Sequence, residues 1–365
     1  MRHPRSANLM TDSQDAKQQY GILRPLYEAF AARVASLVGE LLTTSHISHS
    51  QVEHRAKTTD SVAEKVRRKG YTNPLSDIKD LAGVRVIVYY HDDVQRVAEM
   101  IRREFDVDPN HSSDKLEELS VDEFGYRSFH LVCRLNSARR SLAEWSKYRD
   151  LFVEIQVRSV LQHAWAAISH KIDYKAVSQA PAELRRALYR LSALLELADD
   201  QFATLRDSSS ELVQRYQAQV VRGKLDIPLN IDSLTQYLHE KVDLDEWRRL
   251  GVEAGMDDPH EVAFKAPDVS KLLAVLQAVN VKTLAEFQQL LDKHRPGAAG
   301  HLRVFADEVR HEGRGFFAVP VDVISALVTI AERDRLPPGF EWTKPWREDI
   351  RRTVRRLISK TAPST

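Results

Sequence analysis

The feature that most constrains the fold is a series of short apolar segments separated by amphipathic ones in the first half of the chain. The segments AGVRVIVYY (residues 82–90), GYRSFHLVCRL (125–135) and LFVEIQVRSV (151–160) are short and rich in β-branched or aromatic residues, which is typical of strands. Residues 92–105 and 159–175 instead show helical periodicity. Strands that alternate with helices predict an α/β domain over about residues 45–178.

The rest of the chain is predicted to be mostly helical. Residues 1–44 are expected to form a tail followed by a helix, because Tyr27, Phe30 and Val34 recur at helical spacing. A second helix is expected from about Ser61 to a C-cap at Gly70. Residues 179–222 are predicted as a helical extension and 223–365 as a mostly helical C-terminal domain. The segment RGKLDIPLN (222–230) is the best candidate for a linker, and HRPGAAG (294–300) for a loop.

Composition narrows the class of protein further. The chain has 365 residues and a net charge of +1, so an anion-binding site must come from local clustering of basic residues. Its one cysteine, Cys133, excludes an intramolecular disulfide and alternates with Leu131 on the apolar face of a strand, which predicts a buried and inert thiol. No apolar stretch has the length of a membrane helix or a signal peptide, so we expect a cytoplasmic protein without membrane contact.

Polar side chains share one face of each predicted strand, because residues two apart in a strand point the same way. These residues are Glu154, Gln156 and Arg158 on one strand, Tyr126, Ser128 and His130 on another, and Arg85 on a third, which Asp80 precedes. A solvated face of a sheet would explain any one of these strands alone. A carboxylate, an amide, a guanidinium, an imidazole and a tyrosine together indicate a binding site.

A basic cluster precedes these strands. Arg55 and Lys57 come just before the helix that begins near Ser61, and Lys65 lies one turn beyond Ser61 on the same face. Such a cluster at a helix N-terminus could hold a polyphosphate, although a solvated basic helix is the alternative. Phosphates beside carboxylates suggest Mg²⁺-dependent chemistry, because Mg²⁺ is commonly held by one or two carboxylates and the substrate's phosphates.

Four segments carry a resemblance to a known family. RAKTTDSVAEK (55–65), DIKDLAGVRVIVYY (77–90), FGYRSFHLV (124–132) and VEIQVRSVLQHAWAAISHKIDYK (153–175) resemble, in order and spacing, the motifs of the RelA/SpoT nucleotide pyrophosphokinases, the alarmone synthetases. The resemblance covers residues 45–178. It implies a nucleotidyltransferase-like mixed sheet flanked by helices, and transfer of pyrophosphate from ATP to the 3′-hydroxyl of GDP or GTP to make (p)ppGpp.

The resemblance also implies roles for individual residues. Asp80 and Glu154 would be the catalytic pair and would hold Mg²⁺, with Glu154 as a possible base. The residues implied for ATP are Arg55, stacked on adenine, with Lys57, Ser61, Lys65 and Arg85. The residues implied for the acceptor are Tyr126, stacked on its base, with Ser128, His130, Gln156 and Arg158.

The sequence departs from this pattern before Tyr126. Family members that use GDP or GTP usually carry a lysine four residues before the tyrosine, where this chain has Asp122. Toxic small synthetases resemble this version of the motif, and some of them pyrophosphorylate the 3′ end of tRNA. The sequence therefore leaves three functions open: alarmone synthesis, tRNA modification, and a catalytically dead nucleotide-binding module. The intact Asp80 and Glu154 argue against the third.

Two further segments carry only general expectations. The HDD at residues 91–93 looks like a metal dyad, but its place between a strand and a helix favours an N-cap role for Asp92 or Asp93, so we expect no hydrolase activity. The C-terminal domain shows no assignable motif and no metal-ligand spacing among its histidines. We expect it to regulate the synthetase by sensing a protein partner, and the chain could also form an oligomer.

Overall fold

In the computed structural model, the chain forms two compact units, residues 1–206 and 207–365. The structure describes residues 4–71, 73–114, 128–171, 181–259, 264–311, 313, 315–338, 340, 342 and 348–359. Tyr126 and Asp122 lie outside the described residues. No helix among the described residues is long and apolar enough to cross a membrane.

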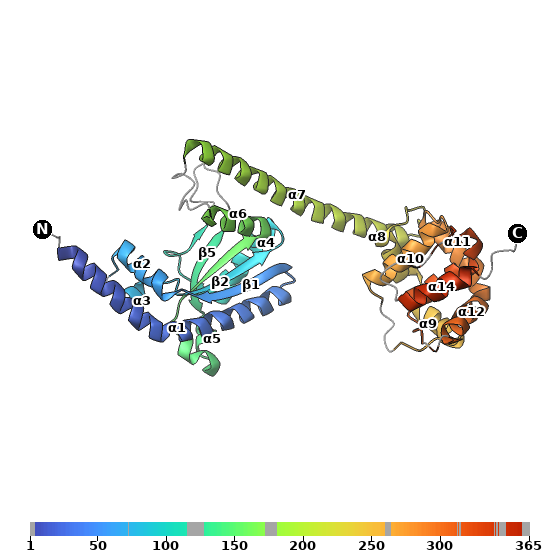
Figure 1. The fold of residues 1–365 in the computed structure, drawn as a ribbon, viewed down its shortest axis with the longest axis horizontal. Helices are drawn as coiled ribbons and strands as arrows, with labels where there is room; N and C mark the ends of the chain where they lie inside the picture. Colours follow the sequence, from blue (N-terminus) through green and yellow to red (C-terminus); the bar gives the residue numbers. More distant parts are fainter. Residues whose placement is uncertain are drawn as a thin grey trace. The chain divides into compact units, whose positions relative to one another are not determined.

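The first unit is built on one mixed sheet of six strands, in the order β1-β2-β6-β5-β3, with β4 also paired to β5 (Figure 1). The strands are β1 (His49–Ala56), β2 (Ala82–Val88), β3 (Phe105–Val107), β4 (Ser113–Asp114), β5 (Phe129–Leu135) and β6 (Val153–Ser159). β2 and β6 pair in parallel, and the other neighbours pair antiparallel. The predicted mixed sheet flanked by helices is confirmed.

Helices connect these strands and cover the sheet. They are α1 (Pro4–Thr44), α2 (Thr59–Lys69), α3 (Pro74–Asp77), α4 (His91–Glu104), α5 (Ser137–Arg140), the 3₁₀ helix η1 (Ala143–Tyr148), α6 (Val160–Lys171) and α7 (Ala182–Val221). α2 begins after an N-cap at Thr58 and ends at Gly70, whose left-handed conformation (φ 65°) favours glycine. α1 already begins at Pro4, so the expected tail is much shorter than the sequence suggested.

One face of the sheet is the hydrophobic core of the first unit. The inward residues of β6, Val153, Ile155 and Val157, are completely buried and belong to one cluster with apolar residues of α1 and α4. Cys133 is also fully buried, which confirms the predicted buried thiol, and burial raises the pKa of that thiol. The opposite face is the one that carries the polar residues, because Glu154, Gln156 and Arg158 alternate with these core positions.

The HDD segment does not cap its helix. The N-cap of α4 is Tyr90, so the predicted N-cap role of Asp92 or Asp93 is wrong. Asp92 instead accepts two hydrogen bonds from Arg206 at 3.0 and 2.7 Å, and Asp93 accepts one from Arg96 at 2.5 Å. Both carboxylates are therefore used in ion pairs, one of which ties α7 to α4.

The second unit is a bundle of helices around its own core. They are α8 (Ile231–Lys241), α9 (Leu244–Glu253), α10 (Ala266–Ala278), α11 (Leu284–His294), α12 (Ala298–His311), α13 (Pro320–Ala331) and α14 (Glu348–Ser359), with 3₁₀ turns at Arg295–Gly297 and Arg333–Arg335. The mostly helical C-terminal region is confirmed. The predicted loop at 294–300 is instead a 3₁₀ turn and the start of α12.

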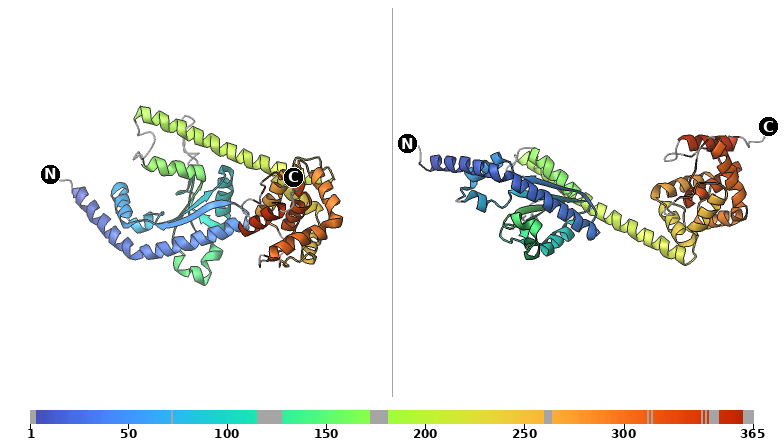
Figure 2. Two further views of the ribbon diagram at one scale, coloured as in Figure 1. Left: turned by 45° about the vertical axis from the view of Figure 1, so that its right-hand side comes forward. Right: turned by 90° about the horizontal axis from the view of Figure 1, so that it is seen from below.

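The expected linker at residues 222–230 is part of this second unit. Ile227 is 3% exposed in the C-terminal core, and the backbone of Leu225 and Leu229 is hydrogen-bonded to Ala285 and Lys282. The chain passes between the units through α7, a continuous helix of 40 residues (Figure 2). The boundary at residue 206 therefore falls inside a helix, not in a loop with Pro and Gly.

Candidate active site

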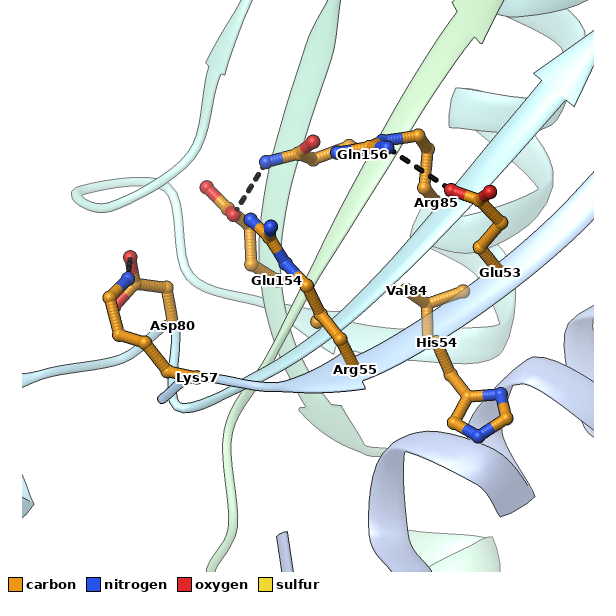
Figure 3. A pocket seen from close by; sticks show the side chains of 10 residues that line it. Glu53, His54, Arg55, Lys57, Asp80, Val84, Arg85, Glu154 and Gln156 are labelled. Atoms are coloured by element: carbon orange, nitrogen blue, oxygen red, sulfur yellow. Dashed lines mark hydrogen bonds and ion pairs between the residues drawn. The ribbon is translucent and has the colours of Figure 1, made fainter. Parts of the chain in front are cut away.

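The polar face of the sheet brings distant residues into neighbouring positions. The parallel pairing of β2 with β6 sets Gly83 beside Glu154, and the antiparallel pairing of β1 with β2 sets Arg55 on the other side of Gly83. A second row, two residues along, runs across four strands through Glu53, Arg85, Gln156 and His130. Residues opposite each other in a sheet project from the same face, so the side chains of these two rows lie together; Figure 3 shows those of Glu53, Arg55, Arg85, Glu154 and Gln156.

These rows line a cavity of about 450 Å³. Its lining residues are Glu53, His54, Arg55, Lys57, Asp80, Gly83, Val84, Arg85, Glu154 and Gln156. Asp80 and Glu154, which are 74 positions apart in the chain, thus face the same space.

Asp80 lies directly before β2 and is held by two lysines. Lys57 Nζ donates to its Oδ2 at 2.6 Å, and Lys65 Nζ donates to its Oδ1 at 2.9 Å. Burial opposes ionisation of Asp80, but the ion pairs with Lys57 and Lys65 outweigh it and hold the pKa of this carboxyl below its usual range. Asp80 is therefore a carboxylate at neutral pH.

Glu154 is held by the neighbouring strand. Its Oε1 lies 3.1 Å from Nδ1 of His130, and its Oε2 accepts a hydrogen bond from Gln156 at 2.8 Å. Because Arg158 Nη2 lies 3.4 Å from the other ring nitrogen of His130, the proton of a neutral imidazole belongs on Nδ1, facing Glu154. Burial raises the pKa of Glu154, but the contacts with His130 and Gln156 lower it by more, so the pKa of this carboxyl lies below its usual range.

The carboxylates fit Mg²⁺ better than a metal enclosed by protein ligands. Within the described residues, no group of three or more His, Cys, Asp or Glu side chains is arranged to hold a metal ion. Mg²⁺ demands oxygen ligands and keeps several waters, so one or two carboxylates and substrate phosphates suffice for it. Asp80 and Glu154 would supply that protein share.

A second cavity of about 380 Å³ continues along the same face. It is lined by Arg55, Arg85, His130, Gln156, Arg158, His163, Ala166 and Ala167, three of which also line the first cavity. Burial, and the positive charges of Arg85 and Arg55, lower the pKa of Arg158 to about 10. Such a concentration of guanidinium groups favours an anionic ligand.

Most of the predicted site residues meet in these two cavities. Those that line a cavity or contact a residue that does are Arg55, Lys57, Lys65, Asp80, Arg85, His130, Glu154, Gln156 and Arg158. Ser61 lies in the first turn of α2, bonded to its N-cap Thr58, and lines neither cavity. Ser128 is 7% exposed and also lines neither cavity.

Sequence reasoning missed several residues of the site. Glu53 pairs with Arg85 at 3.1 Å, and His163 of α6 closes the second cavity. Glu53 lies two residues before Arg55, so a prediction of β1 as a strand would have placed both side chains on the same face. Gly83 lies between Arg55 and Glu154 on the cavity floor, where the absence of a side chain keeps the space open.

Helix α1 is hydrogen-bonded to the backbone on which Lys57 and Asp80 lie. Tyr20 is fully buried, and its hydroxyl donates to the carbonyl of Lys57 at 2.9 Å, with the carbonyl of Leu81 at 3.3 Å. Glu28, also on α1, accepts a hydrogen bond from the backbone N–H of Ala56 at 3.0 Å. Burial raises the pKa of Tyr20 to about 12, so its hydroxyl stays a donor. One phenol thus ties the end of β1 to the residue that follows Asp80.

A cavity with paired carboxylates, lysines and arginines on one face of a mixed sheet is the arrangement that an enzyme of phosphoryl or pyrophosphoryl transfer requires. Comparison with known proteins gives the same class. The model of the region found in RelA / SpoT proteins matches residues 54–179. GTP pyrophosphokinase YjbM of Bacillus subtilis is 32% identical over 217 residues, which are 58% of this chain and 97% of that protein.

Other proteins are also similar to this chain. GTP pyrophosphokinase YwaC of Bacillus subtilis is 25% identical over 206 residues, covering 54% of this chain and 94% of that protein. The crystal structure of small alarmone synthetase 1 from Bacillus subtilis aligns at a TM-score of 0.44 and 28% identity, over 53% of this chain and 98% of that one. The chain belongs to the RelA/SpoT family, as its motifs predicted.

The role of Gly83 can be tested by filling the cavity. The three atoms nearest to a Cβ at this position all belong to Arg55 and lie at 3.7 Å or more, so Gly83→Ala should fold with little loss of stability, and Gly83→Val adds two further methyl groups. Because the added groups enter the cavity, we expect the affinity for ATP to fall from glycine to alanine and again from alanine to valine. For valine the loss should be about tenfold or more, which corresponds to about 1.4 kcal/mol. Calorimetric titration and thermal unfolding measure the two effects. Unchanged ATP binding by Gly83→Val would show that the ligand lies elsewhere.

The support from α1 can be tested by removing one oxygen. Tyr20→Phe keeps the packed ring but removes one donor from the carbonyls of Lys57 and Leu81, which should lower the free energy of unfolding by about 0.5–1.5 kcal/mol and weaken ATP binding. Urea unfolding and ATP titration measure both. Tyr27→Phe is the matched control, because the Tyr27 hydroxyl, on the same helix, bonds to none of the residues that the structure describes. Equal effects of the two substitutions would argue against the support role.

Proposed function

We propose that this chain transfers the β,γ-pyrophosphoryl group of ATP to the 3′-hydroxyl of GDP or GTP and releases AMP. The observation that carries the proposal is the single cavity in which Asp80 and Glu154 face Lys57 and two arginines. The names of two relatives, both GTP pyrophosphokinases, support the nucleotide acceptor. In YjbM the similarity extends over 97% of the relative, so it is not limited to the motifs.

In this proposal, the side of the cavity formed by β1 and α2 binds ATP. Arg55 and Arg85 lie on neighbouring strands, in adjacent rows, and offer two planar cations that could stack on the faces of a base. Lys57 and Lys65 would bind the phosphates, with Ser61 at the start of α2. These contacts fix the β-phosphorus in the cavity, and positioning is much of what such a reaction needs.

The acceptor would lie toward β5 and α6. Tyr126 and Ser128 precede His130 in the chain, and His130, Gln156 and Arg158 line the second cavity, where the acceptor's phosphates would find the unbalanced positive charge. This arrangement favours an acceptor that carries its own phosphates over one that does not. The two cavities share Arg55, Arg85 and Gln156, so donor and acceptor would meet between them.

The chemical step follows from this placement. The 3′-oxygen forms a bond to the β-phosphorus, while the bond from that phosphorus to the bridging oxygen of the α-phosphate breaks, and that oxygen leaves with AMP. The proton of the hydroxyl passes to a carboxylate oxygen of Glu154, which His130 and Gln156 keep oriented. A bound Mg²⁺, held by Asp80 and Glu154, would neutralise charge on the transferred phosphates.

The C-terminal unit is proposed to regulate this reaction. The helix that leads into it also contacts the site's own strand, because Ser159, directly after Arg158, donates a hydrogen bond of 2.6 Å to Asp199 of α7. A change transmitted along α7 would therefore reach β6. Expression of residues 1–222 should arrest growth more strongly than expression of the full chain, and equal arrest by both would exclude an inhibitory role.

The proposed transfer is tested with ATP labelled in the β-phosphate and three acceptors: GDP, GTP and deacylated tRNA. We expect label on the guanine nucleotides and stoichiometric AMP. Label on tRNA alone would support the modification of tRNA instead, and no label on any acceptor, with the C-terminal unit present or removed, would contradict the proposal.

The role of Glu154 is tested in the same assay. Glu154→Gln should reduce the rate by about 10²–10⁴-fold, the usual contribution of a positioned base, while the thermal unfolding midpoint changes little. Glu53→Gln is the matched control, because Glu53 lines the same cavity but pairs with Arg85 and touches neither Asp80 nor Glu154 in the described structure. Its effect should fall mainly on the KM for ATP. A Glu154→Gln enzyme with full activity would exclude the role.

A further inference from the structure

Both carboxylate oxygens of Asp80 are occupied by lysines. Lys57 Nζ lies 2.6 Å from Oδ2, and Lys65 Nζ lies 2.9 Å from Oδ1. The three side chains are 20–21% exposed, so the cluster is largely shielded from water. Among the residues that the structure describes, Asp80 is also the only carboxylate with which either lysine forms an ion pair.

This arrangement conflicts with the roles that the proposed function gives to the same three residues. There, Lys57 and Lys65 bind the phosphates of ATP, and Asp80 helps to hold Mg²⁺. Mg²⁺ needs its oxygen ligands at about 2.0–2.1 Å. It cannot share Asp80 with two ammonium groups without placing four positive charges around one carboxylate, and repulsion at such distances is strong where water is partly excluded.

A nucleotide removes the conflict. Its phosphates offer the lysines an alternative anion, and each ammonium group sits on a flexible four-carbon stem that can move to it. Asp80 cannot follow them, because the next residue is fixed: the carbonyl of Leu81 accepts hydrogen bonds from the Lys57 N–H at 2.9 Å and from the Tyr20 hydroxyl at 3.3 Å. The lysines would therefore leave Asp80 behind, with both oxygens free.

We propose that Lys57 and Lys65 have a second role: without nucleotide they occupy Asp80 in place of the metal and keep divalent cations out. Arrival of the triphosphate draws the lysines away and opens the metal site. The inference rests on the proposed function in one respect, that ATP phosphates engage these lysines. It follows that cation and nucleotide bind cooperatively, each raising the affinity of the other by the same factor, about 5–150-fold for typical couplings.

The experiment measures Mn²⁺ binding to the full chain without nucleotide, from the electron paramagnetic resonance signal of the free ion. Lys57→Met and Lys65→Met remove one occupant each, so each should bind Mn²⁺ more tightly than the natural chain, by about 5-fold or more. Lys57→Arg and Lys65→Arg keep the charge and should not. Lys69→Met is the matched control, because it removes a positive charge from the exposed end of the same helix without touching Asp80. Asp80→Asn should weaken Mn²⁺ binding.

A second measurement tests the coupling between cation and nucleotide. Calorimetric titration with an ATP analogue, in which a methylene group replaces the α–β bridging oxygen, should show tighter binding when Mn²⁺ is present, and Lys65→Met should lose most of that gain. Methionine variants that bind Mn²⁺ no better than Lys69→Met would overturn the inference. So would a natural chain that binds Mn²⁺ equally well with and without the analogue, or that binds no Mn²⁺ even when the analogue is bound.

These outcomes are independent of the proposed transfer. Neither measurement includes an acceptor or requires turnover. Failure to label any acceptor would therefore not contradict the proposal that Lys57 and Lys65 leave Asp80 for the phosphates of the nucleotide. Conversely, a chain that labels GDP but shows no coupling between Mn²⁺ and the analogue would keep its function and lose this mechanism. Thermal unfolding of each variant shows whether it is folded, and Lys57→Gln and Lys65→Gln replace any methionine variant that is not.

Discussion

The parallel pairing of β2 with β6 is the interaction on which the rest of the site depends. It sets Gly83 beside Glu154 and Arg85 beside Gln156, and thereby joins residues more than 70 positions apart in the chain. A shift of this register by one residue would turn Glu154 into the core and Val153 into the cavity. The shifted register is unfavourable because it would bury an unpaired charge in the core and expose apolar side chains on the polar face. The apolar half of β6 thus fixes the position of its polar half, and the site is specified by the core behind it.

The charges of the site are arranged so that each carboxylate is already compensated. Asp80 is paired with two lysines and Glu154 is hydrogen-bonded to His130 and Gln156, so both remain ionised although they are largely buried. The arginines are less balanced: Arg85 has Glu53, while Arg158 has only the imidazole of His130 among its hydrogen-bond partners in the described chain. The excess positive charge therefore lies toward the second cavity, while Asp80 with its two lysines lies at the first.

Much of this could be predicted from the sequence, and the failures share a cause. Alternation within β5 and β6 gave the faces of those strands correctly, because every second residue must be apolar to reach the core. β1, by contrast, reads His-Ser-Gln-Val-Glu-His-Arg-Ala, with no β-branched run, because it is an edge strand whose side chains are mostly exposed. The sequence of β1 therefore reads as a basic segment before a helix, and this interpretation gives no reason to place Glu53 in the site. Residues 222–230 carried Gly and Pro and read as a linker, although Ile227 is buried; local composition cannot show a contact made by a distant helix.

The family motifs begin at residue 54, yet the geometry they describe depends on residues before them. Tyr20, Arg24 and Glu28 of α1 bond to the backbone of Ala56, Lys57 and Leu81, which positions the strand end that carries Lys57 and the turn that carries Asp80. These contacts use carbonyl and N–H groups, so they leave no pattern in the motif residues themselves. A motif thus records residues of the cavity, while the separation between Lys57 and Asp80, short enough for an ion pair of 2.6 Å, is supported by a helix that the motif does not include.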